Sequence, residues 1–115
     1  MQRFVDTPVW SRPSAVKSWE WYLGDHDGDV SPYAAPARAT DLAGLPPAYV
    51  SVMEFDPLRD EGIDYATRML AAGVTVELHC FPGTYHGSGV VVSAAVNKRE
   101  HAERMAVWRR ALRLT

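Results

Sequence analysis

At 115 residues, the chain is long enough for one small domain with one modest hydrophobic core. Apolar residues make up 47% of it and charged residues 23%, proportions of a folded globular protein that exclude a disordered chain. A net charge of −2 gives no electrostatic reason for a nucleic-acid partner or an acidic membrane partner.

The first part of the chain is expected to hold little regular structure. Residues 1–14 contain two prolines and no hydrophobic period, so we expect an extended arm. Residues 15–23 place apolar side chains at the i, i+3, i+4 spacing of a helix, and Gly24 is a suitable C-terminal stop. The rest of the segment 15–47 is rich in proline, which predicts a loop.

A strand, a helix and a second strand follow. Residues 48–53 are apolar at nearly every position, which is typical of a strand buried on both faces in a parallel sheet. Residues 59–72 predict a helix with an apolar face formed by Ile63, Ala66 and Leu70. Residues 74–81 predict the second strand, and a crossover of this length favours a parallel pair.

The last segment, residues 95–112, predicts a long closing helix. Its period places four apolar side chains on the face that we expect to pack inward: Ala102, Met105, Trp108 and Leu112. The fold class is therefore α/β, with a βαβα unit over residues 48–115, a short parallel sheet and about three helices.

An acid and a base candidate follow the two strands. Asp56 lies in the segment 54–62, and His86 lies in the segment 81–87. Because the carboxyl ends of neighbouring parallel strands meet at one edge of a sheet, we expect the two side chains to meet. The simpler interpretation makes Asp56 a helix cap and His86 an exposed loop residue.

A nucleophile to accompany this pair is missing. A hydrolase that activates a serine needs an imidazole to take the serine proton and a carboxylate to orient the imidazole. The sequence contains no Gly-x-Ser-x-Gly turn, and none of its nearby serines follows a strand on a sharp turn: Ser31, Ser51, Ser88 and Ser93. The chain alone is therefore expected to be chemically incomplete.

Other candidate sites are weaker. The acidic residues at 25, 27 and 29 resemble the start of a calcium loop, but Val30 replaces the required glycine. Strand alternation sends His79 and Cys80 to opposite faces, so they predict no metal pair, and we expect Cys80 to be buried. We expect no metal and no cofactor. One cysteine and the lack of a signal or membrane-spanning segment predict a soluble cytoplasmic protein.

Several motifs carry a family resemblance, and they span about four fifths of the chain. They are Trp19-x-x-Tyr22-Leu23, the segments 29–38 and 42–48, Asp56-Pro-Leu-Arg-Asp-Glu-Gly62, the segment 70–74 and Pro82-Gly83-x-x-His86-Gly87. Through them the chain resembles the C-terminal part of the hormone-sensitive-lipase-like branch of the α/β-hydrolase esterases, the fold-3 family.

The resemblance implies a partial α/β-hydrolase fold in which residues 1–115 form a C-terminal fragment. It implies that Asp56 is the acid and His86 the base of a catalytic triad, and that the substrate is a small carboxylic ester. The family's nucleophile serine and its oxyanion loop lie upstream of the matched region. We therefore expect an esterase component that is inactive alone.

An alternative is a non-catalytic remnant or a binding module from a truncated esterase gene. The resemblance also makes Ala48–Met53 an interior strand of a larger sheet. Its free edge has no lysine to protect it, so we expect self-association or a partner chain at this edge. Neither nucleic acid nor a membrane is expected as a partner.

Overall fold

Two short parallel strands organise the chain in the computed structural model, which describes residues 4–114. They are β1 (Ala48–Met53) and β2 (Val76–Phe81), joined by the helix α2 (Arg59–Ala71). The register pairs Ala48 with Val76 and Met53 with Phe81, so the strands begin and end together. The expected parallel βαβ arrangement is confirmed.

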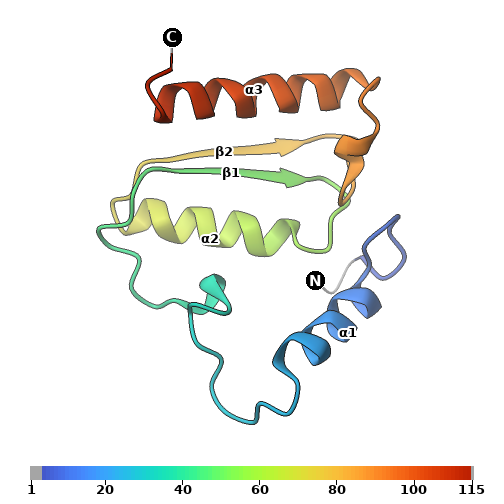
Figure 1. Cartoon of the computed structure of the whole chain (residues 1–115), viewed down its shortest axis with the longest axis vertical. Helices are drawn as coiled ribbons and strands as arrows, with labels where there is room; N and C mark the ends of the chain where they lie inside the picture. The colour runs from blue at the N-terminus through green and yellow to red at the C-terminus, as the bar shows by residue number, and fades with distance from the viewer. Residues whose placement is uncertain (1–3, 115) are drawn as a thin grey trace.

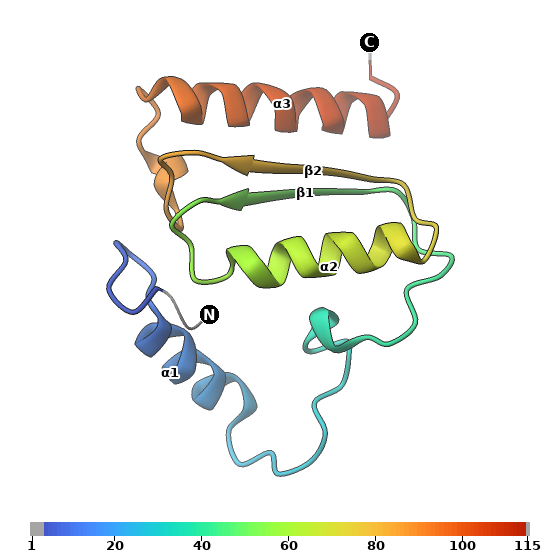
Figure 2. The same ribbon diagram turned by 180° about the vertical axis from the view of Figure 1, so that it is seen from behind.

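The helices form layers around this sheet (Figure 1). The closing helix α3 (Ala95–Ala111) lies on one face and α2 on the other. The helix α1 (Arg12–Leu23) lies beyond α2, as the view from behind also shows (Figure 2). Two single turns complete the elements, η1 (Pro36–Arg38) and η2 (Ser88–Val90). With three α-helices and a short parallel sheet, the expected fold class is confirmed.

The face that α2 turns toward the sheet is rotated by one position from the expected face. Leu70 was predicted to point inward, but it is 51% exposed, while Met69 is buried with Leu42 and Val74. The helix presents Gly62, Ala66 and Met69 to the sheet instead. Gly62 explains this choice, because the missing side chain lets the helix backbone come close to β1.

The predicted inward face of α3 is wrong. Trp108 is 54% exposed, and the other three residues of that face are exposed as well. The face turned toward the sheet instead carries the buried Asn97 and Glu100. The reason lies in the sheet, whose surface under α3 is polar. There Tyr49 has a pKa raised by burial and by the charge of nearby carboxylates, Glu100 among them.

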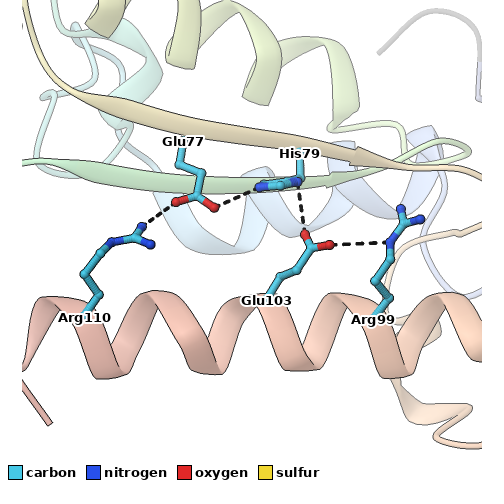
Figure 3. Close-up of polar contacts among 5 residues, drawn as sticks. All are labelled: Glu77, His79, Arg99, Glu103 and Arg110. Carbon is cyan, nitrogen blue, oxygen red and sulfur yellow. Dashed lines mark hydrogen bonds and ion pairs between the residues drawn. The ribbon is translucent and has the colours of Figure 1, made fainter. Parts of the chain in front are cut away.

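Ion pairs attach α3 to β2 (Figure 3). His79 lies between two carboxylates, with Nε2 3.0 Å from Glu77 and Nδ1 3.1 Å from Glu103. Arg110 from the end of α3 donates to Glu77, and Arg99 pairs with Glu103. The charged face of α3 thus forms ion pairs with β2, while the apolar face of α3 is exposed.

Three local predictions also need correction. The helix α1 begins at Arg12, inside the arm expected over residues 1–14, and residues 1–3 of that arm lie outside the described part of the chain. Pro13 stands in the first turn of the helix, where proline is tolerated. The strand β2 begins at Val76, because the Val74 amide donates to Met69 and belongs to the turn after α2. Cys80 is exposed, since no other described element covers its place on the sheet.

No helix within residues 4–114 has the length and apolar character needed to cross a membrane.

Replacing Gly62 by alanine tests the close approach of α2 to β1. A Cβ atom at this position would lie 2.7 Å from a Val52 methyl group, inside the core. We expect Gly62→Ala to lower the free energy of unfolding by about 1 to 3 kcal/mol, despite the higher helix propensity of alanine. Urea denaturation measures this. The control is Gly89→Ala, where a Cβ meets no atom within 4 Å; equal stability of both variants would contradict the packing.

The ion pairs under α3 predict a dependence of stability on pH. Hydrogen bonds from His79 and Arg110 lower the pKa of Glu77 below its ordinary value of 4.5. A carboxylate with a lowered pKa stabilises the fold above its unfolded pKa, and this contribution is lost as the pH falls through the folded value. We expect Glu77→Gln to be less stable than the native chain at pH 6, and we expect this difference to shrink as the pH is lowered below 4.5. Urea midpoints across this pH range measure this, and a constant difference would contradict it.

Candidate active site

Asp56 lies in the turn that leads from β1 into α2. It is 8% exposed, and its amide donates to the Met53 carbonyl. Its Oδ1 atom accepts the Leu58 amide at 2.8 Å and so holds the turn before α2, although α2 itself, which begins after Leu58, has no side-chain cap. That contact uses one carboxylate oxygen and leaves Oδ2 for a second partner. Asp56 can therefore hold the turn and act as the acid at the same time.

His86 lies in the loop after β2 and supplies that second partner. Its Nδ1–H donates to Oδ2 of Asp56 at 2.8 Å, across 30 residues of sequence. An ionised carboxylate only accepts, so the contact fixes the proton on Nδ1 and leaves Nε2 with the lone pair. The side chain is 38% exposed, so solvent reaches the imidazole. The expected meeting of the two side chains is confirmed.

Further contacts join the two loops that carry the pair. Thr84 is buried, donates its hydroxyl to Phe81 at 2.6 Å and accepts the Glu54 amide at 3.3 Å. The Glu54 carboxylate accepts the Gly83 amide at 2.6 Å, and the Phe55 amide donates to Thr84 at 2.8 Å. Sequence reasoning missed Thr84 and Glu54. The signal was their position beside the strand ends, where hydroxyl and carboxylate groups satisfy free amides.

The glycines on either side of His86 allow the loop after β2 to turn tightly. Gly83 and Gly87 have φ values of 70° and 75°, in the left-handed region that glycine adopts without a steric penalty. They let the loop turn back after β2, which brings the imidazole over the end of β1.

The other candidate residues from the sequence, four serines and three aspartates, lie outside the Asp56–His86 pair. Within residues 4–114, no hydrogen bond joins any of the four serines to His86. Ser88 is buried two residues further on, at the start of η2. The acidic residues at 25, 27 and 29 are exposed, and the described part of the chain contains no group of three or more potential metal ligands.

Comparison with known proteins gives a consistent set of relatives. A family described as "alpha/beta hydrolase fold" matches residues 1–89. Esterase LipI of Mycobacterium tuberculosis is 43% identical over 95 residues, which are 78% of this chain and 30% of that protein. Carboxylesterase NlhH of the same species is 37% identical over 114 residues, which are 94% of this chain and 35% of that protein.

Solved structures agree with these relatives. A structure titled "Bacterial Heroin Esterase" has a TM-score of 0.91 and 61% identity, and the match covers 95% of this chain and 36% of that one. Esterase LipW from Mycobacterium marinum has a TM-score of 0.90 and 36% identity, over 96% of this chain and 35% of that one. The chain thus spans about a third of the length of the proteins it matches.

Proposed function

The chain belongs to the hormone-sensitive-lipase-like branch of the α/β-hydrolase family, and we propose that it supplies the acid and the base of a serine carboxylesterase. The observation that carries this proposal is the 2.8 Å hydrogen bond between His86 and Asp56. It provides an imidazole with a fixed tautomer whose Nε2 is available as a proton acceptor.

The proposed chemistry has two halves. His86 Nε2 takes the proton of a serine hydroxyl while the serine oxygen bonds to the ester carbonyl carbon. The proton then passes to the alcohol oxygen as the bond from that oxygen to the carbonyl carbon breaks. Water repeats the sequence on the acyl-enzyme: His86 takes a water proton while the water oxygen bonds to the acyl carbon, and the serine oxygen then leaves that carbon as it takes the proton back from His86. Asp56 stays ionised throughout and stabilises the imidazolium.

Residues outside this chain must provide the nucleophile and the oxyanion donors in this proposal. The sequence has no Gly-x-Ser-x-Gly turn, and the chain covers 35% of the carboxylesterase NlhH. The substrate class that the relatives' names support is a carboxylic ester, with no cofactor in the reaction. The part of a related esterase that carries its nucleophile serine is therefore the natural source of the missing groups.

Complementation with an upstream fragment tests this function. We expect the chain alone to hydrolyse p-nitrophenyl acetate no faster than a histidine-containing control protein, and to resist fluorophosphonate labelling. Mixed with the serine-bearing upstream fragment of a related esterase, it should gain activity. His86→Gln and Asp56→Asn should then each lower kcat about 10³-fold or more.

His26→Gln, in the exposed loop after α1 and outside the cavity beside β1, is the matched control and should retain the complemented activity. Complemented hydrolysis that survives His86→Gln would show that His86 is not the base. Burst kinetics with the chain alone would show that one of its own serines is the nucleophile.

The free edge of β1 favours a second proposal, in which the chain binds a strand there whether or not it takes part in catalysis. The amides of Ala48 and Glu54 donate to the β2 side, so alternation turns the odd-numbered backbone groups from Tyr49 to Met53 toward the other edge. Within the described residues, no strand pairs with that edge. A cavity of about 600 Å³ lies beside it, lined in part by Ser51 and Met53.

Self-association measures whether that edge is used. A two-stranded sheet is marginally stable, so we expect the native chain to associate at micromolar concentration. Ser51→Pro removes one outward donor without removing a bond to β2 and should favour the monomer, whereas Ser51→Ala should not. Sedimentation velocity distinguishes these outcomes. A cooperatively folded native monomer with the Tyr49, Ser51 and Met53 amides protected from hydrogen exchange would contradict the proposal.

A further inference from the structure

Trp10 lies against the imidazole of His86. The ring centroids are 5.5 Å apart, and the ring planes are tilted by 30°. The hydrogen bond to Asp56 holds the imidazole at one atom, Nδ1, and leaves the ring free to rock about the line to that atom. An aromatic face against the ring removes this freedom, because rocking would lose the contact or drive the two rings together.

The backbone before Trp10 is held in a rare conformation. Val9 has a φ of 66°, which is unusual and strained for a β-branched residue. The Trp10 amide donates to the Pro8 carbonyl at 2.7 Å, and the Thr7 hydroxyl donates to the Trp10 carbonyl. Such strain persists only where the surroundings impose it, so this tight turn fixes the direction in which the indole leaves the chain.

The same turn contacts both loops of the acid–base pair. A Val9 methyl group lies 3.7 Å from the position that a Cβ atom on Gly87 would take, so Val9 packs beside the residue after His86. At the other loop, the Arg59 guanidinium lies over the Phe4 ring, 4.9 Å from its centroid, and donates to the Glu54 carbonyl at 2.8 Å. Residues 4–12 therefore connect the loop after β1 with the loop after β2.

The Trp10 indole contributes its ring rather than a hydrogen bond. Its Nε1–H is buried and has no hydrogen-bond partner. A phenyl ring at this position would therefore keep an aromatic face beside His86 while losing no hydrogen bond. The side chain also borders a cavity of about 500 Å³ between α1 and α2, so a smaller residue would leave the imidazole without that neighbour.

We propose that Trp10 is a positioning residue, which holds the His86 imidazole in the orientation that keeps Nδ1 on Asp56. Its purpose in catalysis rests on the proposed esterase function, whereas its effect on the imidazole can be measured without any hydrolysis. The strained turn at Val9 directs the Trp10 indole toward the His86 imidazole.

Nitrogen NMR of the histidine side chains tests the proposal. In the chain labelled with ¹⁵N-histidine, the four imidazoles are assigned with the help of His86→Gln. We expect the native His86 ring to show the Nδ1–H tautomer and ring-current-shifted protons. Trp10→Ala should abolish the ring-current shift and reduce the separation of the two ¹⁵N signals by at least half, because the tautomers then exchange. Trp10→Phe should restore the native separation.

Trp21→Ala is the matched control, since that indole is 75% exposed and its ring contact is with the Lys17 ammonium rather than with His86. It should leave the His86 signals unchanged. If Trp10→Ala fails to fold, Trp10→Leu fills much of the same volume without an aromatic face and is scored in the same way. A native ¹⁵N separation in a folded Trp10→Ala or Trp10→Leu variant would overturn the proposal.

Activity in the complemented enzyme separates this proposal from the esterase function. Trp10→Ala should lower kcat about tenfold or more while KM stays within about twofold, and Trp10→Phe should retain kcat. The predicted loss of ¹⁵N separation in Trp10→Ala, together with no complemented hydrolysis by the native chain, would reject the esterase function and leave the positioning role standing. Complemented hydrolysis that is insensitive to Trp10→Ala, together with unchanged His86 signals in that variant, would reject the positioning role and leave the esterase function standing.

Discussion

The in-register parallel pairing of β1 with β2 is the constraint on which the rest of the structure depends. Because Met53 pairs with Phe81, both strands end at the same level, and the loops that follow begin side by side. Asp56 and His86 are separated by 30 residues but stand three and five residues after those paired ends. A shift of the register would move one loop relative to the other and break the 2.8 Å contact.

Asp56 shows how a helix entry and an acid–base pair can share one side chain. One oxygen satisfies the Leu58 amide, which fixes the carboxylate relative to α2. The other oxygen can then hold an imidazole without rotating away. The loop after β2 is fixed in turn by Thr84 and by the contact of Gly83 with Glu54. Hydrogen bonds therefore hold the site on both sides, through the turn before α2 and through the loop after β2.

The sequence predicted what depends on local chemistry and on chain connectivity. The apolar run Ala48–Met53 predicted a strand with the observed bounds. The length of the connection to the next strand predicted that the two strands are parallel. The Asp56 and His86 motifs gave the pair. The sequence could not predict contacts that depend on which surface lies opposite. Trp108 looks like a core residue by period, but the polar sheet under α3 selects the opposite face of the helix. Trp10 lies in a proline-containing segment without a hydrophobic period, so no local sequence pattern predicted its contact with His86.

The polar attachment of α3 has a thermodynamic consequence. Helices that pack through apolar faces expose much nonpolar surface when they detach, which raises the heat capacity and the denaturant sensitivity of the opening. The contacts of α3 with β2 are mainly ion pairs, with the Arg99 guanidinium over the Phe81 ring as an additional contact. Detachment of α3 would therefore change the heat capacity little and would respond to salt more than to urea. The charged contacts that hold the closing helix should therefore make its attachment more sensitive to ionic strength than a helix packed through an apolar face would be.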